Sequence, residues 1–282
     1  MSRSTTEPTA PDAPAGPARS AAAAISASGA VLAYGRRVAL AAATFEVQAG
    51  ATIALIGPNG SGKSTLLRAL AGLARPQSGR LDVPAREARG GLAFVLQTTD
   101  VERTLPVTVR ETVTMARYAI RGPFGRLRAV DRAAVREALE RMDIVALAGR
   151  QLHELSAGQR QRVLVAQGLA QQADVLLLDE PVTGLDVVSR ELIFQAVAAE
   201  RDAGHTVVVS THDLDDARRA ELVMLLANRV VAFGPPAEVL SDGPLREAYG
   251  GRVLRVPEGV MVMDDPHHDH DHRAHDHHRT GA

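Results

Sequence analysis

A glycine-rich loop at residues 57–65 has the residue types and spacing of a phosphate-binding site. An apolar run at residues 51–56 precedes it and a helical pattern at residues 66–73 follows it, which is the strand–loop–helix context of such loops. Glycines let consecutive backbone N–H groups converge on an anion, and the helix start adds positive potential. The residues expected to bind nucleotide phosphates are Gly57, Pro58, Asn59, Gly60, Ser61, Gly62, Lys63, Ser64 and Thr65.

Two side chains of this loop have individual roles in a nucleotide site. Lys63 is expected to reach the β- and γ-phosphates and to assist catalysis, and the Ser64 hydroxyl is expected to ligate Mg²⁺. Lys63 is the only lysine in the 282 residues, so background composition does not explain it easily. A chance glycine turn is the alternative, and the flanking elements make it the weaker one.

Adjacent carboxylates follow a second apolar run. Residues 175–178 are Val-Leu-Leu-Leu, and Asp179 and Glu180 come directly after them. This pattern predicts a buried parallel strand that ends at an active-site edge. Two neighbouring carboxylates repel each other, and packing explains them poorly. We expect Asp179 to hold Mg²⁺ through water and Glu180 to be the base that polarises the attacking water.

Three other positions allow a functional and an ordinary interpretation. Gln97 ends the apolar run at residues 91–96, and His212 follows the run at residues 205–210. Each is typical of a satisfied polar residue at the end of a strand. Tyr34, in a Tyr-Gly turn ahead of the loop, is either a half-buried strand aromatic or a ring on which adenine stacks. The residues alone leave these alternatives open.

A capped helix is predicted before the acidic pair. Ser156 can cap the helix at residues 160–170, and Gln159 completes a capping box. It is either a well-capped helix and nothing more, or a second anion-binding helix start.

Helical patterns also precede this segment. Residues 110–118 and 131–142 have apolar residues at spacings of three and four, with Asp131 as the expected N-cap of the second helix. A helical block inserted between strands predicts a subdomain on the edge of an α/β core.

Together these motifs resemble the ATPase subunits of ABC transporters, over about residues 26–250. The resemblance implies an α/β fold: a P-loop NTPase (ABC ATPase) core with an inserted helical subdomain at about residues 98–170 and a small antiparallel β subdomain. Residues 1–25 are expected to be a disordered Ala/Pro-rich tail, and residues 251–282 a C-terminal extension.

The resemblance also implies a role for each ambiguous residue. Tyr34 would stack on adenine, Gln97 would link the Mg²⁺ site to the helical subdomain, and His212 would contact the γ-phosphate. Two copies would sandwich two ATP molecules, with Asp186 at the dimer seam. The residues that would close over the nucleotide of the other copy are Ser156, Gly158 and Gln159. Ala157 departs from the glycine that the family most often has there.

Composition excludes several other classes. The formal charge of −1 and the pI near 6.8 argue against a general nucleic-acid binder. The sequence has no cysteine, so it offers neither disulfides nor thiolate metal sites, and it has no run of 18 apolar residues. An Ala-rich segment at residues 18–33 lacks the Leu-rich core of a signal peptide. We expect a peripheral subunit at the cytoplasmic face of the cell membrane, bound to permease subunits and served indirectly by a solute-binding protein.

The segments that point to a cargo are residues 105–118 and 121–127. They resemble the zinc/manganese-uptake branch of these ATPases, although iron-chelate and cobalamin importers share parts of the pattern. The main alternatives are the ATPase of an iron-chelate or other small-solute transporter, and a soluble ABC ATPase acting on DNA or ribosomes. A metal-storage protein with a degenerate ATPase core is a third.

The C-terminal tail is rich in metal-ligating side chains. Neutral imidazoles bind Zn²⁺ well, and the interleaved aspartates add oxygen ligands, whereas Mn²⁺ prefers oxygen. The sequence therefore indicates a Zn²⁺ buffer or sensor, with a disordered polar tail as the alternative. The candidate ligands are His267, His268, His270, His272, His275, His277 and His278.

Overall fold

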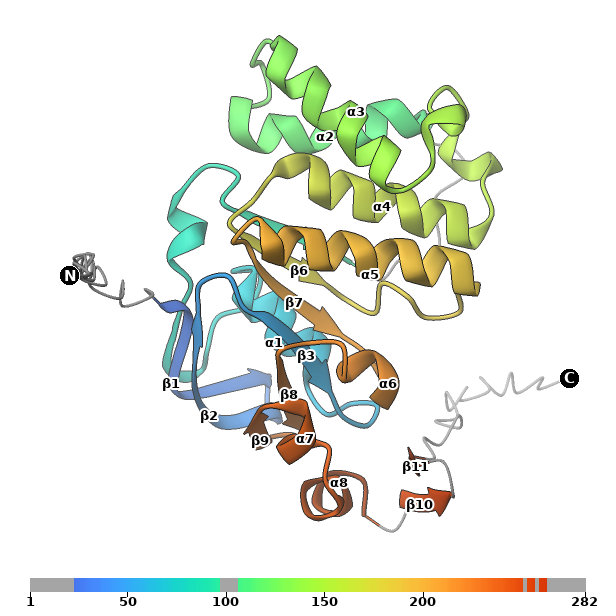
Figure 1. Cartoon of the computed structure of the whole chain (residues 1–282). Helices are drawn as coiled ribbons and strands as arrows, with labels where there is room; N and C mark the ends of the chain where they lie inside the picture. The colour runs from blue at the N-terminus through green and yellow to red at the C-terminus, as the bar shows by residue number, and fades with distance from the viewer. Residues whose placement is uncertain (1–22, 97–105, 251–252, 257–258, 263–282) are drawn as a thin grey trace, which may run out of the picture.

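A six-stranded sheet forms the centre of the computed structural model, which describes residues 23–96, 106–250, 253–256 and 259–262 (Figure 1). Its strand order is β5-β6-β7-β3-β8-β9, and all neighbouring pairs are parallel except β8 with β9. The strands, in sheet order, are β5 (Leu92–Val95), β6 (Val175–Leu178), β7 (Thr206–Ser210), β3 (Thr52–Ile56), β8 (Leu222–Leu226) and β9 (Val230–Gly234).

One face of this sheet packs against helix α1 (Lys63–Leu70) and a second, antiparallel sheet. The second sheet has the order β2-β1-β4, with β1 (Ala23–Tyr34), β2 (Arg37–Gln48) and β4 (Ser78–Asp82). Strands β3, β6 and β7 are buried along their whole length on both faces, and most of their side chains are apolar. Their alternate side chains therefore enter two different cores.

The other face carries helix α5 (Val187–Asp202) and, beside it, a block of three helices that packs on β5, β6 and α5 (Figure 1). The block consists of α2 (Val109–Arg121), α3 (Ala129–Arg141) and α4 (Ala157–Gln171). On the same face, a separate core lies under the C-terminal helices, where Ala54 and Ile56 pack against Leu214 and Leu245. Those helices are α6 (Leu214–Ala217), α7 (Pro236–Val239) and α8 (Asp242–Tyr249), and a hairpin of β10 (Val253–Val256) and β11 (Gly259–Val262) follows.

A buried ion-pair network joins the three helices of the block. The Asp131 carboxylate lies 2.9 Å from Nη2 of Arg117 and 2.9 Å from Nε of Arg121, both on α2. Arg117 also donates to the carbonyl oxygens of Ala170 and Gln171 at the end of α4. Burial acts to raise the pKa of Asp131, but the hydrogen bonds from Arg121, the Arg128 N–H and Arg117 outweigh it and hold this pKa well below its usual value.

The prediction that Asp131 is an N-cap is wrong. Helix α3 begins at Ala129, so Asp131 lies inside the first turn, where its carboxylate accepts from the Arg128 N–H at 2.8 Å. The carboxylate still satisfies the helix start, but it does so from the third helical position. The other carboxylate oxygen, Oδ1, accepts hydrogen bonds from Arg117 and Arg121 of α2. The local sequence around Asp131 does not reveal these contacts between helices.

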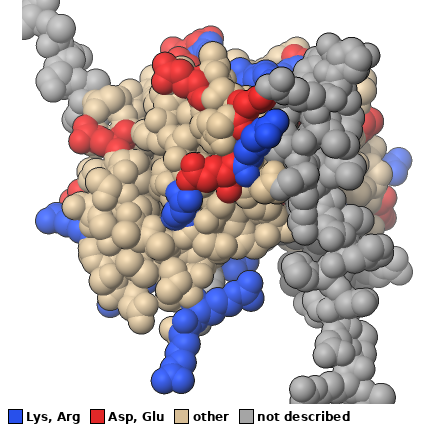
Figure 2. All heavy atoms as spheres, turned by 90° about the horizontal axis from the view of Figure 1, so that it is seen from below, with Lys and Arg blue, Asp and Glu red and all other residues tan. Residues whose placement is uncertain are grey.

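Charged side chains of both signs are interspersed among uncharged ones on the face drawn in Figure 2. Among the described residues, no helix is both long enough and apolar enough to cross a membrane.

Candidate active site

Three neighbouring parallel strands bring the predicted chemistry to one edge of the sheet. The glycine-rich loop follows β3, the acidic pair follows β6, and His212 lies two residues after β7. Because β6, β7 and β3 are adjacent and parallel, their carboxyl ends meet at the same edge. Residues separated by more than 100 positions therefore face one another.

The glycines of the loop are required by close backbone contacts. A Cβ on Gly57 would lie 2.1 Å from the carbonyl oxygen of Leu226, and one on Gly62 would lie 2.6 Å from that of Ala39. Both residues also have positive φ angles, 154° and 106°, which side chains disfavour. The loop is thus fitted between the end of β8 and the strand β2.

The turn between β8 and β9 holds the loop in place through Asn228. The Asn228 side-chain amide donates to the carbonyl oxygens of Gly60 (3.0 Å) and Ala39 (3.2 Å), and its backbone N–H donates to that of Ser61 (3.0 Å). Its own carbonyl accepts from Ala41 N–H at 2.7 Å. Sequence reasoning missed this residue, and an asparagine in a short connection between two apolar runs is the signal that could have found it.

Lys63 and Ser61 are the buried polar side chains of the loop. Nζ of Lys63, a residue 5% exposed, donates to the carbonyl oxygens of Gly57 at 2.6 Å and Pro58 at 3.3 Å. The Ser61 hydroxyl is buried and has no hydrogen-bond partner among the described atoms. An unsatisfied buried hydroxyl is costly, and an anion in the cradle would satisfy it.

A pair of hydroxyls connects the loop to the acids. Asp179 Oδ1 accepts from the Ser64 hydroxyl at 3.1 Å and from the Ser210 hydroxyl at 2.7 Å. The Ser210 oxygen in turn accepts from the backbone N–H of Glu180 at 2.9 Å. Ser210, which is fully buried at the end of β7, was not among the predicted site residues. The hydroxyl and carboxylate oxygens of Ser64 and Asp179 are the ligand types that Mg²⁺ prefers, so these residues fit a magnesium nucleotide.

Glu180 is held in an unusual backbone conformation beside His212. Its φ of 45° lies in the left-handed region, which costs a non-glycine residue about 1 kcal/mol. Its Oε2 accepts from the Thr183 hydroxyl at 3.1 Å and lies 3.8 Å from Nδ1 of His212, the distance of an ion pair. The neighbouring His212 lowers the pKa of Glu180 against the opposing effect of burial, and the Glu180 carboxylate raises the pKa of His212 above 6.5. Each group therefore favours the charged form of the other.

The predicted capping box at Ser156 is confirmed. The Ser156 hydroxyl accepts from Gln159 N–H at 3.2 Å, and the Gln159 side chain accepts from Ser156 N–H at 3.0 Å. Helix α4 starts beside the start of α5, since a Cβ on Gly158 would lie 3.5 Å from Oδ2 of Asp186. Asp186 is the N-cap of α5 and accepts from Ser189 N–H at 2.9 Å.

Other predicted positions are described only in part or not at all. Tyr34 is the last residue of β1 and pairs with Arg37 across the turn. Gln97 and the histidines of the C-terminal tail lie outside the described residues. Within the described ranges, no group of three or more His, Asp or Glu residues could hold a metal ion.

Comparison with known families agrees with this geometry. Residues 40–183, which contain the loop, the helical block and both acids, match the family described as ABC transporter. The chain belongs to the ABC transporter family.

Relatives within this family transport metals. The chelated iron transport system membrane protein YfeB of Yersinia pestis is 40% identical over 233 residues, covering 79% of this chain and 78% of the relative. The manganese transport system ATP-binding protein MntB of Listeria innocua is 35% identical over 236 residues, covering 82% and 98%. The zinc transport system ATP-binding protein TroB of Treponema pallidum is 36% identical over 248 residues, covering 86% and 92%. These relatives confirm the resemblance to the metal-ion branch.

Solved ABC transporter structures have the same fold. The dimeric structure of MJ0796, a bacterial ABC transporter cassette, aligns with a TM-score of 0.66 and 27% identity, covering 75% of this chain and 98% of that one. The predicted fold class, an ABC ATPase core with a helical block and a small antiparallel sheet, is confirmed.

Proposed function

We propose that this ABC-family ATPase energises the import of a transition-metal ion, zinc or manganese, through a membrane permease. The hydrogen-bonded chain from Ser64 through Asp179 and Ser210 to the Glu180 backbone carries the ATPase part of this proposal. It connects the hydroxyl and the carboxylate that would bind Mg²⁺ with the backbone of the candidate base. The manganese and zinc transport names of two relatives support the choice of cargo.

In the proposed mechanism, water attacks the γ-phosphorus of ATP and the bond to the β-phosphate oxygen breaks, leaving ADP and phosphate. Glu180 accepts the proton of the attacking water. Bound Mg²⁺ would supply charge neutralisation between the β- and γ-phosphates, held by Ser64 and, through water, by Asp179. Lys63 and the charged His212 would stabilise negative charge on the γ-phosphate. Gln97 would link the magnesium site to the helical block.

Two copies of the subunit would share each nucleotide. Tyr34 would stack on adenine in one copy, and the helix start at Ser156, Gly158 and Gln159 of the other copy would close over the phosphates. The start of α4 suits this role because the positive end of a helix dipole favours anions. Asp186 would lie at the seam, beside that helix start. The assembly would bind permease subunits at the cytoplasmic face of the membrane. An extracytoplasmic solute-binding protein would deliver the metal ion to the permease.

Chelated iron is the alternative cargo. The 40% identity to YfeB supports it, although the manganese and zinc relatives are covered over more of their own lengths. Metal content of cells lacking this protein, measured by mass spectrometry after growth in zinc-poor or manganese-poor medium, separates the cases. A selective fall in zinc or manganese is expected, whereas a fall in iron alone would replace the proposed cargo.

We also propose that the histidine-rich tail binds Zn²⁺, on the density of ligands from His267 to His278. Isothermal titration of Zn²⁺ into the full chain should show binding that is lost on deletion of residues 264–282. Equal binding by both proteins would remove the tail from the proposal.

Glu180→Gln tests the catalytic assignment. Removal of the base should lower kcat for ATP hydrolysis by about 10²-fold or more while ATP binding is retained. Glu154→Gln is a matched control, because Glu154 is an exposed carboxylate whose hydrogen bond among the described residues comes from the Gln151 N–H. Unchanged hydrolysis in Glu180→Gln would refute the role of Glu180.

A further inference from the structure

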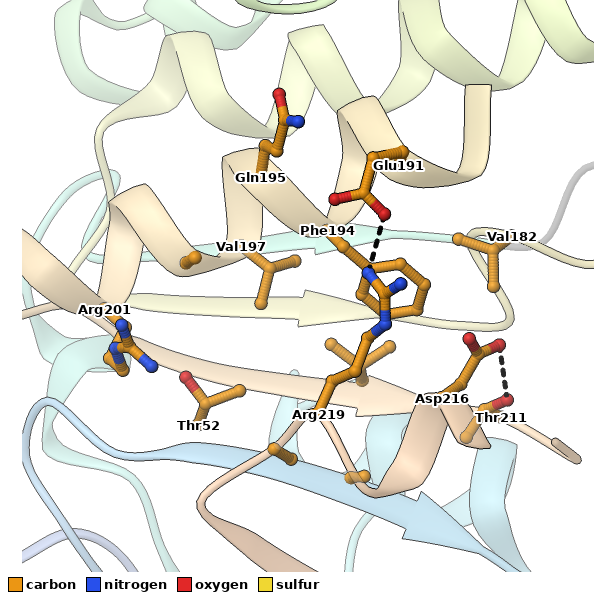
Figure 3. Close-up of a pocket in the computed structure, with 14 residues that line it drawn as sticks. Thr52, Val182, Glu191, Phe194, Gln195, Val197, Arg201, Thr211, Asp216 and Arg219 are labelled. Atoms are coloured by element: carbon orange, nitrogen blue, oxygen red, sulfur yellow. Dashed lines mark hydrogen bonds and ion pairs between the residues drawn. The ribbon is translucent and has the colours of Figure 1, made fainter. Parts of the chain in front are cut away.

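A cleft of about 440 Å³ separates the two elements that follow the catalytic candidates (Figure 3). Helix α5 begins shortly after Glu180, and α6 begins directly after His212 and Asp213. The cleft lies between the core under α5 and the core under the C-terminal helices, and its walls include Val182 and Thr211. The cleft interrupts the apolar packing between these elements, and polar contacts connect them across it.

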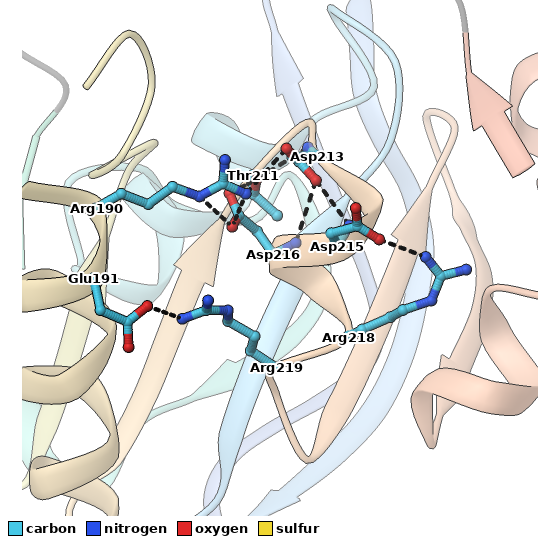
Figure 4. A network of polar contacts seen from close by, with 8 residues as sticks. All are labelled: Arg190, Glu191, Thr211, Asp213, Asp215, Asp216, Arg218 and Arg219. Atoms are coloured by element: carbon cyan, nitrogen blue, oxygen red, sulfur yellow. Dashed lines mark hydrogen bonds and ion pairs between the residues drawn. The ribbon is translucent and has the colours of Figure 1, made fainter. Parts of the chain in front are cut away.

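Arg190 of α5 makes the contacts that reach the His212 segment (Figure 4). Its Nε donates to Asp216 Oδ1 at 2.9 Å, and its Nη2 donates to Asp213 Oδ2 at 3.1 Å and also contacts Asp216 Oδ1. The guanidinium thus binds two carboxylates at once, which fixes its orientation as well as its position.

The two carboxylates hold the backbone on both sides of His212. Asp213 Oδ1 caps α6 by accepting from the N–H groups of Asp215 (2.8 Å) and Asp216 (3.3 Å). The Thr211 hydroxyl donates to Asp216 Oδ2 at 3.4 Å, and its oxygen accepts from Asp213 N–H at 3.0 Å. His212 lies between two residues whose positions depend on this network.

Arg190 also connects to the start of α5. Its backbone N–H donates to the carbonyl oxygen of Asp186, the N-cap of that helix, at 3.0 Å. One helical turn therefore separates the proposed dimer seam from the guanidinium that holds the His212 segment. A displacement of the α5 start would be transmitted through Arg190 to Asp213 and Asp216.

We propose that Arg190 is a positioning residue for His212, and that it couples closure at the Asp186 seam to the placement of the histidine at the γ-phosphate. The proposal rests on the proposed function of His212. Arg190 balances two acids beside a site for a polyanion, so its loss leaves Asp213 and Asp216 repelling each other and the phosphates. Burial opposes the charge on Arg190, but Asp216 and Asp213 together raise its pKa, so the guanidinium stays charged. Burial raises the pKa of Asp216, and the hydrogen bond and charge of Arg190 oppose that rise.

Arg190→Met should lower kcat for ATP hydrolysis about 10-fold and change the KM for ATP less than twofold, because it disturbs a group that acts on the transition state. Arg219→Met is the matched control. Arg219 spans the same cleft, but it donates to Glu191 at 2.9 Å and lies 4.4 Å over the Phe194 ring. Its removal should leave kcat within twofold of the native value.

A double-mutant cycle with His212→Ala separates positioning from general stability. If Arg190 acts through His212, Arg190→Met should cost nothing further once the histidine is absent. Equal losses in the two backgrounds overturn the proposal. Native activity of His212→Ala alone would instead refute the proposed role of the histidine. Arg190→Lys keeps the positive charge but cannot donate to both carboxylates as the guanidinium does, so it should give an intermediate kcat. It replaces Arg190→Met if thermal melting shows that the Met variant is unfolded.

Discussion

A single buried hydroxyl, that of Ser210, positions both acids of the site. It donates to Asp179 and accepts from the Glu180 backbone, so the two carboxylates are placed by a residue from a third segment. This contact also stabilises the positive φ of Glu180, which by itself is unfavourable. At the residue scale, the orientation of the candidate base depends on β7 as much as on its own strand.

The charged state of His212 should set the alkaline limit of activity. The Glu180 carboxylate raises the pKa of His212 above 6.5, so its proton and the ion pair are present below that value and are lost as pH rises through the raised pKa. Glu180 itself, with a lowered pKa, stays ionised until the medium is more acidic than pH 4.5. We therefore expect kcat to fall on the alkaline side, and His212→Gln to abolish that fall.

The pH profiles of kcat for the native protein and both histidine variants check this prediction. His205→Gln is the control, because His205 contacts Glu200 at 2.7 Å, away from the acidic pair. It should keep the alkaline fall. Persistence of the fall in His212→Gln would show that another group titrates.

The sequence predicted those site residues whose neighbours in the chain define their role. The glycine loop, the acids after β6 and the capping box at Ser156 all have local signatures. Ser210 and Asn228 were missed because their partners lie 30 and 168 positions away in the sequence. The short connection between apolar runs marks Asn228 as a turn residue but does not show that it contacts the loop. Their roles follow only from the strand order.

At the element scale, the helical block depends on one buried carboxylate. Asp131 neutralises two arginines of α2, one of which also caps α4. Asp131→Asn should lower the free energy of unfolding by about 3–5 kcal/mol, because it leaves Arg117 buried without a counter-charge. Thermal and urea unfolding measure this loss.

Asp143→Asn is the control for that variant. Asp143 is an exposed carboxylate 3.9 Å from Arg162, and its positive φ of 50° suits asparagine. Its substitution should change the free energy of unfolding by less than about 0.5 kcal/mol. Equal effects of the two substitutions would mean that the network contributes little.

Several strands and helices of the core were predicted from the sequence, but two strands that hold the loop were not. Apolar runs gave β3, β5, β6 and β7, and periodicity gave α2 and α3, because each pattern reflects burial on a definite face. The first helix starts at Lys63 instead of residue 66, since the loop itself supplies its first turn. Strands β8 and β9 were not predicted, although they hold the loop through Asn228.

At the scale of the whole molecule, two exposed apolar side chains lie beside the proposed seam. Val187 and Val188 directly follow Asp186 and are 83% and 68% exposed. With ATP and Mg²⁺, Glu180→Gln should form a dimer detectable by light scattering, and adding Val187→Asp should prevent it because burying a charge is costly.

Val130→Asp in the Glu180→Gln background is the control, since Val130 is 54% exposed at the start of α3, away from the seam. This variant should still dimerise. A dimer that forms equally well with Val187→Asp would place the interface elsewhere.

Lys63 has a consequence for covalent modification of this subunit. It carries the only lysine ε-amino group in 282 residues, and that group is enclosed by carbonyl oxygens of the phosphate loop. The surface cations are arginines, which acyl transfer does not modify in the same way. Acetylation or protein conjugation at lysine therefore has one possible target here. Each such reaction would neutralise or block the proposed nucleotide site, so modification of the lysine would prevent ATP binding and could not serve as a neutral surface label.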